Sequence, residues 1–500
     1  MKKYSKWLFY ILTGISCLAI SCKKQLETQV YGKLAPANFF QSASDFNSAV
    51  ISLYSRFSTD WGYTDPNGTW YANLYNADPK TYIMGSELTT DELQNTWYPD
   101  IQNFTWTASN ATSNATYYAL VPYIARATGT IANMQASTKV SDAIKNKYVA
   151  EAKALRAWMM YILYGYYGPV NVKLDPATLT DTAQTPRLNA IDYSAAIVKD
   201  INDALPYLEV STNTDAANWG RVNQGTALMT LLRLYMHDKN WNSAITTAKK
   251  IIALGAWSLQ TNYQDVFNVK ANSEIIYAVP SNSLQLNYWP TGIFPGNIAS
   301  YVANGITYNV TYTGWSTDDN NGFFMPASFY NQFESGDLRK NQIIKSYTST
   351  SGQLITRSNP IPLKYTNING QYLGGSGYGI QWVVYRYAEV LLSLAEAENE
   401  VSGPTSEDLG YVAQIRSRAG LSMVGWASFT QAQLRDAISD ENGREFYDEG
   451  KRRSDLIRQG KFIQYAKNRG VNAQAYQTLF PIPENIILQG HGVVQQNPGY

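Results

Sequence analysis

The sequence predicts a mainly α-helical protein in which helical hairpins form a scaffold and a large, irregular, loop-rich lobe contains a few short strands. Two patterns favour this fold class. Apolar residues recur at the i, i+3, i+4 and i+7 spacing of amphipathic helices in about 41–60, 115–254 and 384–465. In about 61–114 and 255–383 that spacing is lost, and Gly, Asn, Ser and Thr mix with aromatic residues. The helical segments are therefore expected to carry the loops.

The first helices are predicted by apolar residues on one face. Phe46, Val50, Leu53 and Phe57 mark a helix for which Ser44 is the expected N-cap. Two longer helices are expected at 117–134 and 142–164, and together they have the form of a helical hairpin.

A second group of helices follows a connection that contains proline. Ile197, Ile201 and Leu205 line one helix, and two more are expected at 222–237 and 241–254, on either side of a short polar turn. That last pair spans about 33 residues, close to the 34-residue tetratricopeptide period. We therefore expect tetratricopeptide-like hairpins of degenerate sequence.

The C-terminal helices begin at Tyr385, run to about Phe462, and are interrupted by Gly403 and Pro404. Their last part carries many charges, in which Glu449 and Arg453 are spaced to attract each other on one helix. We interpret this charged cluster as helix packing rather than as a catalytic centre.

Composition excludes some classes of partner. Forty basic and thirty-nine acidic residues give a net charge of +1, so binding to nucleic acid is not expected. Only 16% of residues are charged, whereas the chain has 38 Tyr and 13 Trp. Tyrosine is typical of amphipathic binding surfaces.

The N-terminus predicts export. Three lysines precede an apolar run, Trp7 to Ile20, of the size found in secretory signals. The segment from Leu18 to Cys22 resembles a bacterial lipobox, whose cysteine is lipidated, although Ala19 stands where leucine is commoner. We expect a signal peptide at 1–21, a tether at 22–40 and a single domain at 41–500. A plain signal peptide that is cleaved elsewhere is the alternative.

Few residues are suited to catalysis. His237 and His491 are isolated, no Gly-x-Ser-x-Gly elbow is present, and zinc or phosphate-loop motifs are absent from the sequence. Adjacent acids, Asp91 with Glu92 and Asp318 with Asp319, could in principle serve a glycosidase. We expect no enzyme activity, no cofactor and no metal, while a calcium site on loop carboxylates stays open.

The chain resembles the SusD/RagB lipoproteins of the Bacteroidetes outer membrane. Separate fragments carry the resemblance over essentially the whole chain: Glu87-Leu-Thr-Thr-Asp-Glu92, Ala154-Leu-Arg-Ala157, Tyr167-Gly-Pro-Val170, Trp219-Gly-Arg-Val222, Arg386-Tyr-Ala-Glu-Val-Leu-Leu392, Ile415-Arg-Ser-Arg-Ala-Gly-Leu421, Arg444-Glu-Phe446 and Phe480-Pro-Ile-Pro483. The family often has Glu-Arg ahead of the Arg-Glu-Phe segment, whereas Asn442 follows Glu441 here. This departure removes one expected ion pair.

The resemblance implies a protein that is held at the outer membrane by lipid on Cys22 and exposed at the cell surface. It also implies capture of an oligosaccharide and its delivery to a SusC-like TonB-dependent transporter. The family's glycan-stacking positions correspond to the two aromatic loop regions. They imply that Trp97, Tyr98, Tyr288, Trp289 and Trp315 bind the ligand, with Trp70, Trp106 and Phe323 in reserve. A peptide-binding member of the family and, less favoured, a surface glycoside hydrolase are the alternatives.

Overall fold

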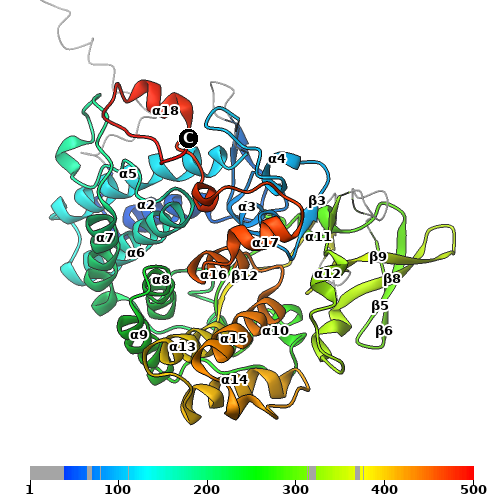
Figure 1. Ribbon diagram of the computed structural model, residues 1–500. Coiled ribbons are helices and arrows are strands. Elements are labelled where there is room, and N and C mark those ends of the chain that lie inside the picture. The colour runs from blue at the N-terminus through cyan, green and yellow to red at the C-terminus, as the bar shows by residue number, and fades with distance from the viewer. Residues whose placement is uncertain are drawn as a thin grey trace, which may run out of the picture.

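The structure confirms the predicted fold class: helices dominate, and a lobe of short strands lies to one side of them (Figure 1). This computed structural model describes residues 39–64, 70–78, 80–110, 112–311, 314, 322–365, 372–374 and 377–500. The principal scaffold helices are α2 (Ala43–Leu53), α5 (Asn114–Ala136), α6 (Asp142–Tyr167), α7 (Ala190–Ala204), α8 (Gln224–His237), α9 (Trp241–Ala253), α13 (Tyr387–Ser402), α14 (Ser406–Arg418) and α15 (Gln431–Phe446).

The scaffold helices pack mainly against their neighbours in the chain. α5 packs on α6, α6 on α7 and α8 on α9, and α13 then lies against α9, α14 and α15. The predicted bounds of α5, α6, α8 and α9 agree with the structure to within three residues at each end. Helices from α5 to α9 each pack on the next, and α13 joins α9 to α14 and α15, so the array continues along the chain as helical repeats do.

Local caps explain where several helices begin. Ser42, rather than the expected Ser44, caps α2, because the Ser42 hydroxyl accepts from the Asp45 backbone N–H while the Asp45 carboxylate accepts from the Ser42 backbone N–H, which completes a capping box. Thr405 and Asp408 form the same motif at the start of α14. Each box satisfies backbone N–H groups that would otherwise have no partner in the first turn.

A buried two-stranded ladder precedes α13. β12 (Trp382–Arg386) pairs antiparallel with β4 (Ile275–Val279), and all residues of both strands are buried. Tyr385 and Arg386 therefore belong to a strand, and the helix expected from Tyr385 begins at Tyr387. This ladder connects the lobe to the scaffold.

The lobe is built around a four-stranded antiparallel sheet in the order β6-β5-β8-β9, seen at the right of Figure 1. Its remaining elements are small: β3 pairs with β7, β1 with β2, and β10 with β11. The bounds are β1 (Gly62–Thr64), β2 (Trp70–Ala72), β3 (Gln94–Asn95), β5 (Ile298–Ala303), β6 (Ile306–Asn309), β7 (Phe323–Phe324), β8 (Ile343–Ser349), β9 (Leu354–Pro362), β10 (Tyr372–Gly374) and β11 (Gly377–Tyr378).

Shorter helices connect these parts. They are α3 (Tyr82–Leu88), α4 (Pro99–Gln102), α10 (Asp265–Asn268), α11 (Trp289–Ile293), α12 (Ala327–Tyr330), α16 (Arg452–Arg458), α17 (Phe462–Asn468) and α18 (Glu484–Gln489). One hydrophobic cluster runs from Phe46 in the scaffold to Ile298 and Tyr347 in the sheet, so the lobe shares its core with the helices. Within the described ranges, no helix is both long enough and apolar enough to cross a membrane.

Candidate ligand-binding site: an aromatic rim

A pair of aromatic rings marks one end of the candidate site. Trp61 and Tyr288 lie with ring centroids 4.9 Å apart and an angle of 30° between the ring planes, and both side chains are partly exposed. Asp60 lies beside them, and its Oδ1 accepts a hydrogen bond from the Trp61 backbone N–H at 2.8 Å. Burial, and then the Asp60 charge, raises the pKa of Tyr288. The Tyr288 hydroxyl therefore stays protonated and can donate.

A second pair of aromatic residues follows β3. The Asn95 amide oxygen accepts a hydrogen bond from the Trp97 backbone N–H at 2.6 Å, while Asn95 itself pairs with Phe323 across the β3–β7 ladder. The Trp97 ring meets Phe323 edge to face at 6.0 Å, yet 36% of Trp97 remains exposed. Tyr98 is half-buried, and burial together with the nearby charge of Asp78 raises its pKa. The ladder thus positions both rings at the surface.

A buried asparagine connects the two pairs. Asn76 donates hydrogen bonds from Nδ2 to the carbonyl oxygens of Asp60, at 2.6 Å, and Trp61, at 3.0 Å. Its Oδ1 accepts from the backbone N–H of Asp78 at 2.7 Å, and Asp78 lies next to Tyr98. We call Trp61, Trp97, Tyr98 and Tyr288 the aromatic rim.

The chemistry of the aromatic rim follows from its composition. Partly exposed rings can lie against the apolar C–H faces of a ligand, while Asp60 and Asp78 supply carboxylate oxygens that accept hydrogen bonds. Asp78 is partly exposed, and burial raises the pKa of its carboxyl group. Trp61, Asp60 and Asp78 are not among the residues that the sequence predicted for the site. Their position next to the aromatic segments was the available signal.

The structure does not place Trp289 on this surface. Trp289 is 0% exposed, its Nε1 donates to Asp448 Oδ2 at 3.1 Å, and its ring packs against Phe323 and Trp382. A ring whose two faces are covered cannot stack on a ligand, so packing replaces the role expected for Trp289. The reserve residues Phe323 and Trp106 are also buried, with 1% and 4% exposed.

Some expected residues cannot be placed. Trp315 and the acidic pair Asp318 and Asp319 lie outside the described residues, as does Cys22. For Trp70 the structure describes a backbone position in β2 and no side chain. The role of Trp315 therefore stays a prediction.

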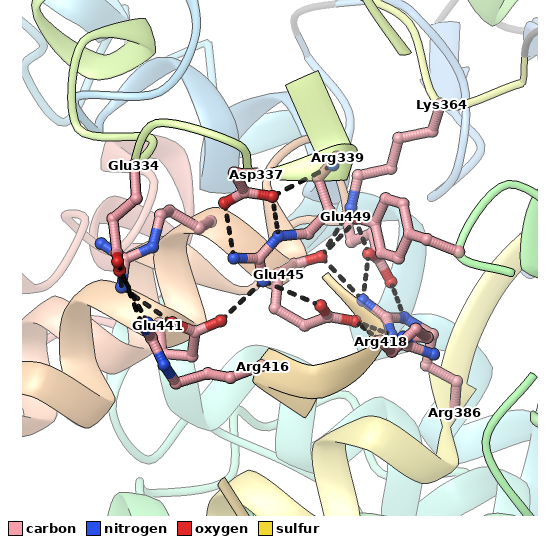
Figure 2. Close-up of polar contacts among 12 residues, drawn as sticks. Glu334, Asp337, Arg339, Lys364, Arg386, Arg416, Arg418, Glu441, Glu445 and Glu449 are labelled. Atoms are coloured by element: carbon pink, nitrogen blue, oxygen red, sulfur yellow. Dashed lines mark hydrogen bonds and ion pairs between the residues drawn. The ribbon is translucent and has the colours of Figure 1, made fainter. Parts of the chain in front are cut away.

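A buried ionic network lies where the lobe meets the C-terminal helices (Figure 2). Arg339 of the lobe pairs with Glu441 at 2.7 Å and with Glu445 at 3.1 Å, both on α15. Arg386, at the end of β12, contacts Glu445 at 2.6 Å. Lys364 of the lobe pairs with Glu449. Buried charges are tolerated when they are paired in this way.

The network agrees with a packing role for the charged C-terminal segment but differs in its pairs. Glu449 binds Lys364 and Arg386 instead of the expected Arg453. Arg453 donates to the carbonyl oxygens of Gly165 and Thr478. Asn442 stands where the family often has arginine, and its amide oxygen accepts a hydrogen bond from Lys451 Nζ at 3.1 Å. A neutral side chain therefore takes the place of the expected arginine.

The acids and histidines considered for catalysis are arranged differently from a catalytic site. Asp91 forms a bidentate pair with Arg452, with distances of 2.9 and 3.0 Å, and Glu92 is 1% exposed. Ser194 donates to Asp238 rather than to His237, so these three residues do not form a nucleophile–base pair. Among the described residues, no group of three or more His, Cys, Asp or Glu side chains could hold a metal ion.

The arrangement of elements defines the class of the protein: a tetratricopeptide-like helical scaffold that supports a loop-rich lobe. The model of the SusD family matches residues 306–500, and SusD-like protein P25 of Formosa agariphila is 24% identical over 96% of each chain. The match of residues 306–500 to the SusD family model agrees with the resemblance to SusD/RagB proteins that the sequence predicted.

Two further comparisons connect the chain to proteins with named ligands. The starch-binding protein SusD of Bacteroides thetaiotaomicron is 31% identical over 125 residues, which are 23% of this chain and 21% of that protein. The structure of surface glycan-binding protein A from the same organism, in complex with laminarihexaose, is 19% identical with a TM-score of 0.70. That match covers 91% of this chain and 99% of the other, and it shows a shared fold.

Proposed function

We propose that this protein binds oligosaccharides at the cell surface through the aromatic rim. The observation that carries the proposal is the grouping of partly exposed rings, Trp61 with Tyr288 and Trp97 with Tyr98, beside the carboxylates of Asp60 and Asp78. A sugar ring has an apolar C–H face that stacks on an aromatic ring, while its hydroxyl groups donate to acceptors at the edge. The rim offers both kinds of contact.

The relatives support this proposal by what their names state. One is a starch-binding protein, and a protein of the same fold was solved with laminarihexaose. If each stacked ring contributes about 1 kcal/mol, a few rings and hydrogen bonds give millimolar to micromolar affinity. Such weak binding suits a receptor that must release its ligand.

The route of the ligand is part of the same proposal. Residues 1–21 direct export, lipid on Cys22 anchors the chain to the outer membrane, and 22–40 tether the single domain of 41–500. The bound oligosaccharide passes to a SusC-like TonB-dependent transporter. Catalysis, a cofactor and a metal ion are not required for this role.

A glycan array probed with soluble protein that lacks residues 1–22 tests the proposal. We expect binding to one family of oligosaccharides without release of new reducing ends. Oligopeptides titrated in parallel provide the comparison, since binding of peptides alone would favour the peptide-binding alternative. Turnover of a glycan that a single carboxylate substitution abolishes would contradict a pure binding role.

A further inference from the structure

A cavity of about 630 Å³ opens next to the aromatic rim, on the side of the scaffold. Asp60 and Gln285 line it, and they lie one residue before Trp61 and three residues before Tyr288. Its other walls come from the end of α2, the turn at 219–221 and the end of β4. The volume falls within the range of ~300–1,000 Å³ that is typical of small-molecule sites. We call it the scaffold pocket.

The turn that carries Trp219 into the scaffold pocket has a fixed shape. Gly220 has a φ of +80°, and a Cβ at this position would lie 2.7 Å from Pro280 Cγ. Tyr277 Oη donates to the Gly220 carbonyl oxygen at 3.2 Å. Backbone geometry and close packing thus require glycine here, and they hold the partly exposed Trp219 at the pocket wall.

The charges around the scaffold pocket disfavour an anionic ligand. Arg221 is the sole cation among its described lining residues, and it already pairs with Glu151 at 2.5 Å and donates to Asn47 at 2.9 Å. Asp60 is the sole acid in that lining. A sulfate or uronate group would therefore meet a carboxylate without finding an available cation.

Two polar atoms of the lining have no hydrogen-bond partner among the described residues. Asn73 is 7% exposed and donates from Nδ2 to the Asp60 carbonyl oxygen at 3.1 Å, but its Oδ1 has no donor. The indole Nε1 of Trp219 likewise has no acceptor. Both atoms are buried in the pocket wall. Buried polar groups are nearly always satisfied, so a hydroxyl-bearing guest that shifts this wall slightly would supply the donor and the acceptor that these atoms lack.

We infer that the scaffold pocket is a subsite for the terminal sugar unit of a neutral oligosaccharide whose chain continues across Trp61 and Tyr288. This inference rests on the proposed function and deepens it by naming the ligand class. The sugar's apolar face contacts the aromatic side chains of the lining, Tyr54, Phe57, Trp219 and Tyr277. Its hydroxyl groups meet the Asn73 and Trp219 polar atoms and the Asp60 carboxylate.

Titration calorimetry with oligosaccharide ladders tests the inference. The probes are neutral β-1,3-gluco-, α-1,4-gluco-, β-1,4-xylo- and β-1,4-manno-oligosaccharides, together with sulfated and uronic acid ladders. We expect binding to be confined to neutral ladders. Trp219→Phe should weaken binding of the long members roughly three- to tenfold and change the short members, which the aromatic rim alone can hold, less than about twofold.

Leu284→Ser provides a variant that cannot act through the core, since Leu284 lines the scaffold pocket and is 91% exposed. It should show the same dependence on ligand length, while Leu488→Ser, at a residue 68% exposed on α18, should show none. If both pocket variants bind the long neutral oligosaccharides as tightly as the unmodified protein does, this inference is overturned, while the proposed function is not. Preference for an acidic ladder would overturn this inference as well. Absence of binding to every ladder would overturn the proposed function and this inference together.

Discussion

Trp289 donates a hydrogen bond from Nε1 to Asp448 Oδ2 at 3.1 Å, and neither side chain is more than 3% exposed. Trp289 begins α11 in the lobe, whereas Asp448 follows α15 of the scaffold with a φ of +61°. On its other side, Trp289 contacts Phe323, which in turn contacts Trp97. The exposed ring of Trp97 is therefore supported by a buried aromatic layer that is fixed to the C-terminal helices.

Trp289→Ala should destabilise the fold. The change leaves a cavity next to Trp382 and removes the partner of a buried carboxyl group, so we expect the free energy of unfolding to fall by about 3–5 kcal/mol. Urea unfolding of the soluble protein measures it. An unchanged midpoint would mean that this indole is not part of the core.

Trp97→Ala should affect binding and leave stability nearly unchanged. With 36% of the residue exposed, truncation opens little of the core, but it removes one stacking surface. We expect a loss of roughly 1 kcal/mol in affinity for an oligosaccharide that binds the unmodified protein. Ile191→Ala, at a residue 80% exposed on α7, is the control. Full affinity of the Trp97 variant would remove this ring from the site.

The contrast between these two tryptophans shows where sequence analysis succeeds and where it stops. Both occur in aromatic segments without helical periodicity, so the sequence could assign them to the lobe but could not separate exposed from buried. Burial is decided by tertiary packing: a Cβ on Gly292, within α11, would lie 2.7 Å from Ala77, which shows how closely this short helix packs. That proximity joins segments more than 200 positions apart.

The ion-pair partners of Glu449 are likewise decided by tertiary structure. The i, i+4 rule paired it with Arg453, but that rule applies only within one continuous helix. Here α15 ends at Phe446 and α16 begins at Arg452, and Asp448 and Gly450 both have positive φ between them. Glu449 is free to turn toward Lys364 and Arg386, which come from other parts of the chain. The scaffold helices were predictable because their periodicity is local.

Acid should destabilise the protein through its buried glutamates. Burial alone would raise the pKa of Glu445, but Arg418, Arg386 and Arg339 outweigh it and lower the pKa from 4.5 to about 2. The ionised group therefore stabilises the fold above pH 4.5, and this contribution is lost as the pH falls toward about 2.

Glu445→Gln tests this pH dependence. We expect it to cost about 3–5 kcal/mol near neutral pH, because the arginines lose a buried partner, and to reduce the fall in stability below pH 4.5. Urea titrations over a series of pH values measure both effects. If the free energy of unfolding of the variant falls below pH 4.5 as steeply as that of the unmodified protein, other groups control the acid dependence.

Glu87 should act in the opposite sense. Burial raises its pKa from 4.5 to about 7, although a neighbouring Glu92 and the Gly450 N–H partly offset this effect. The folded protein then holds a proton that the unfolded chain releases, so the free energy of unfolding should decrease as the pH rises from 4.5 to about 7. Glu87→Gln should reduce this decrease, to which Glu92 and Asp448 also contribute because burial raises their pKa values, whereas Glu484→Gln, at an exposed acid, should leave it unchanged. A decrease of equal size in the Glu87 variant would contradict the assignment.

Two helical glycines should respond to alanine with opposite signs. In α8, a Cβ on Gly225 would lie 2.3 Å from Trp257 Cη2 and 2.8 Å from Ile276 Cγ2, so Gly225→Ala must displace a buried indole or the β4 strand. Overpacking of this kind typically costs about 1–3 kcal/mol.

In α14, a Cβ on Gly410 would meet nothing within 4 Å. Gly410→Ala should therefore stabilise the protein by roughly 0.5–1 kcal/mol, because alanine loses less backbone entropy than glycine when a helix forms. Thermal and urea unfolding of the two variants compare the signs directly. Stabilisation by both would mean that α8 does not approach Trp257 as closely as the structure places it.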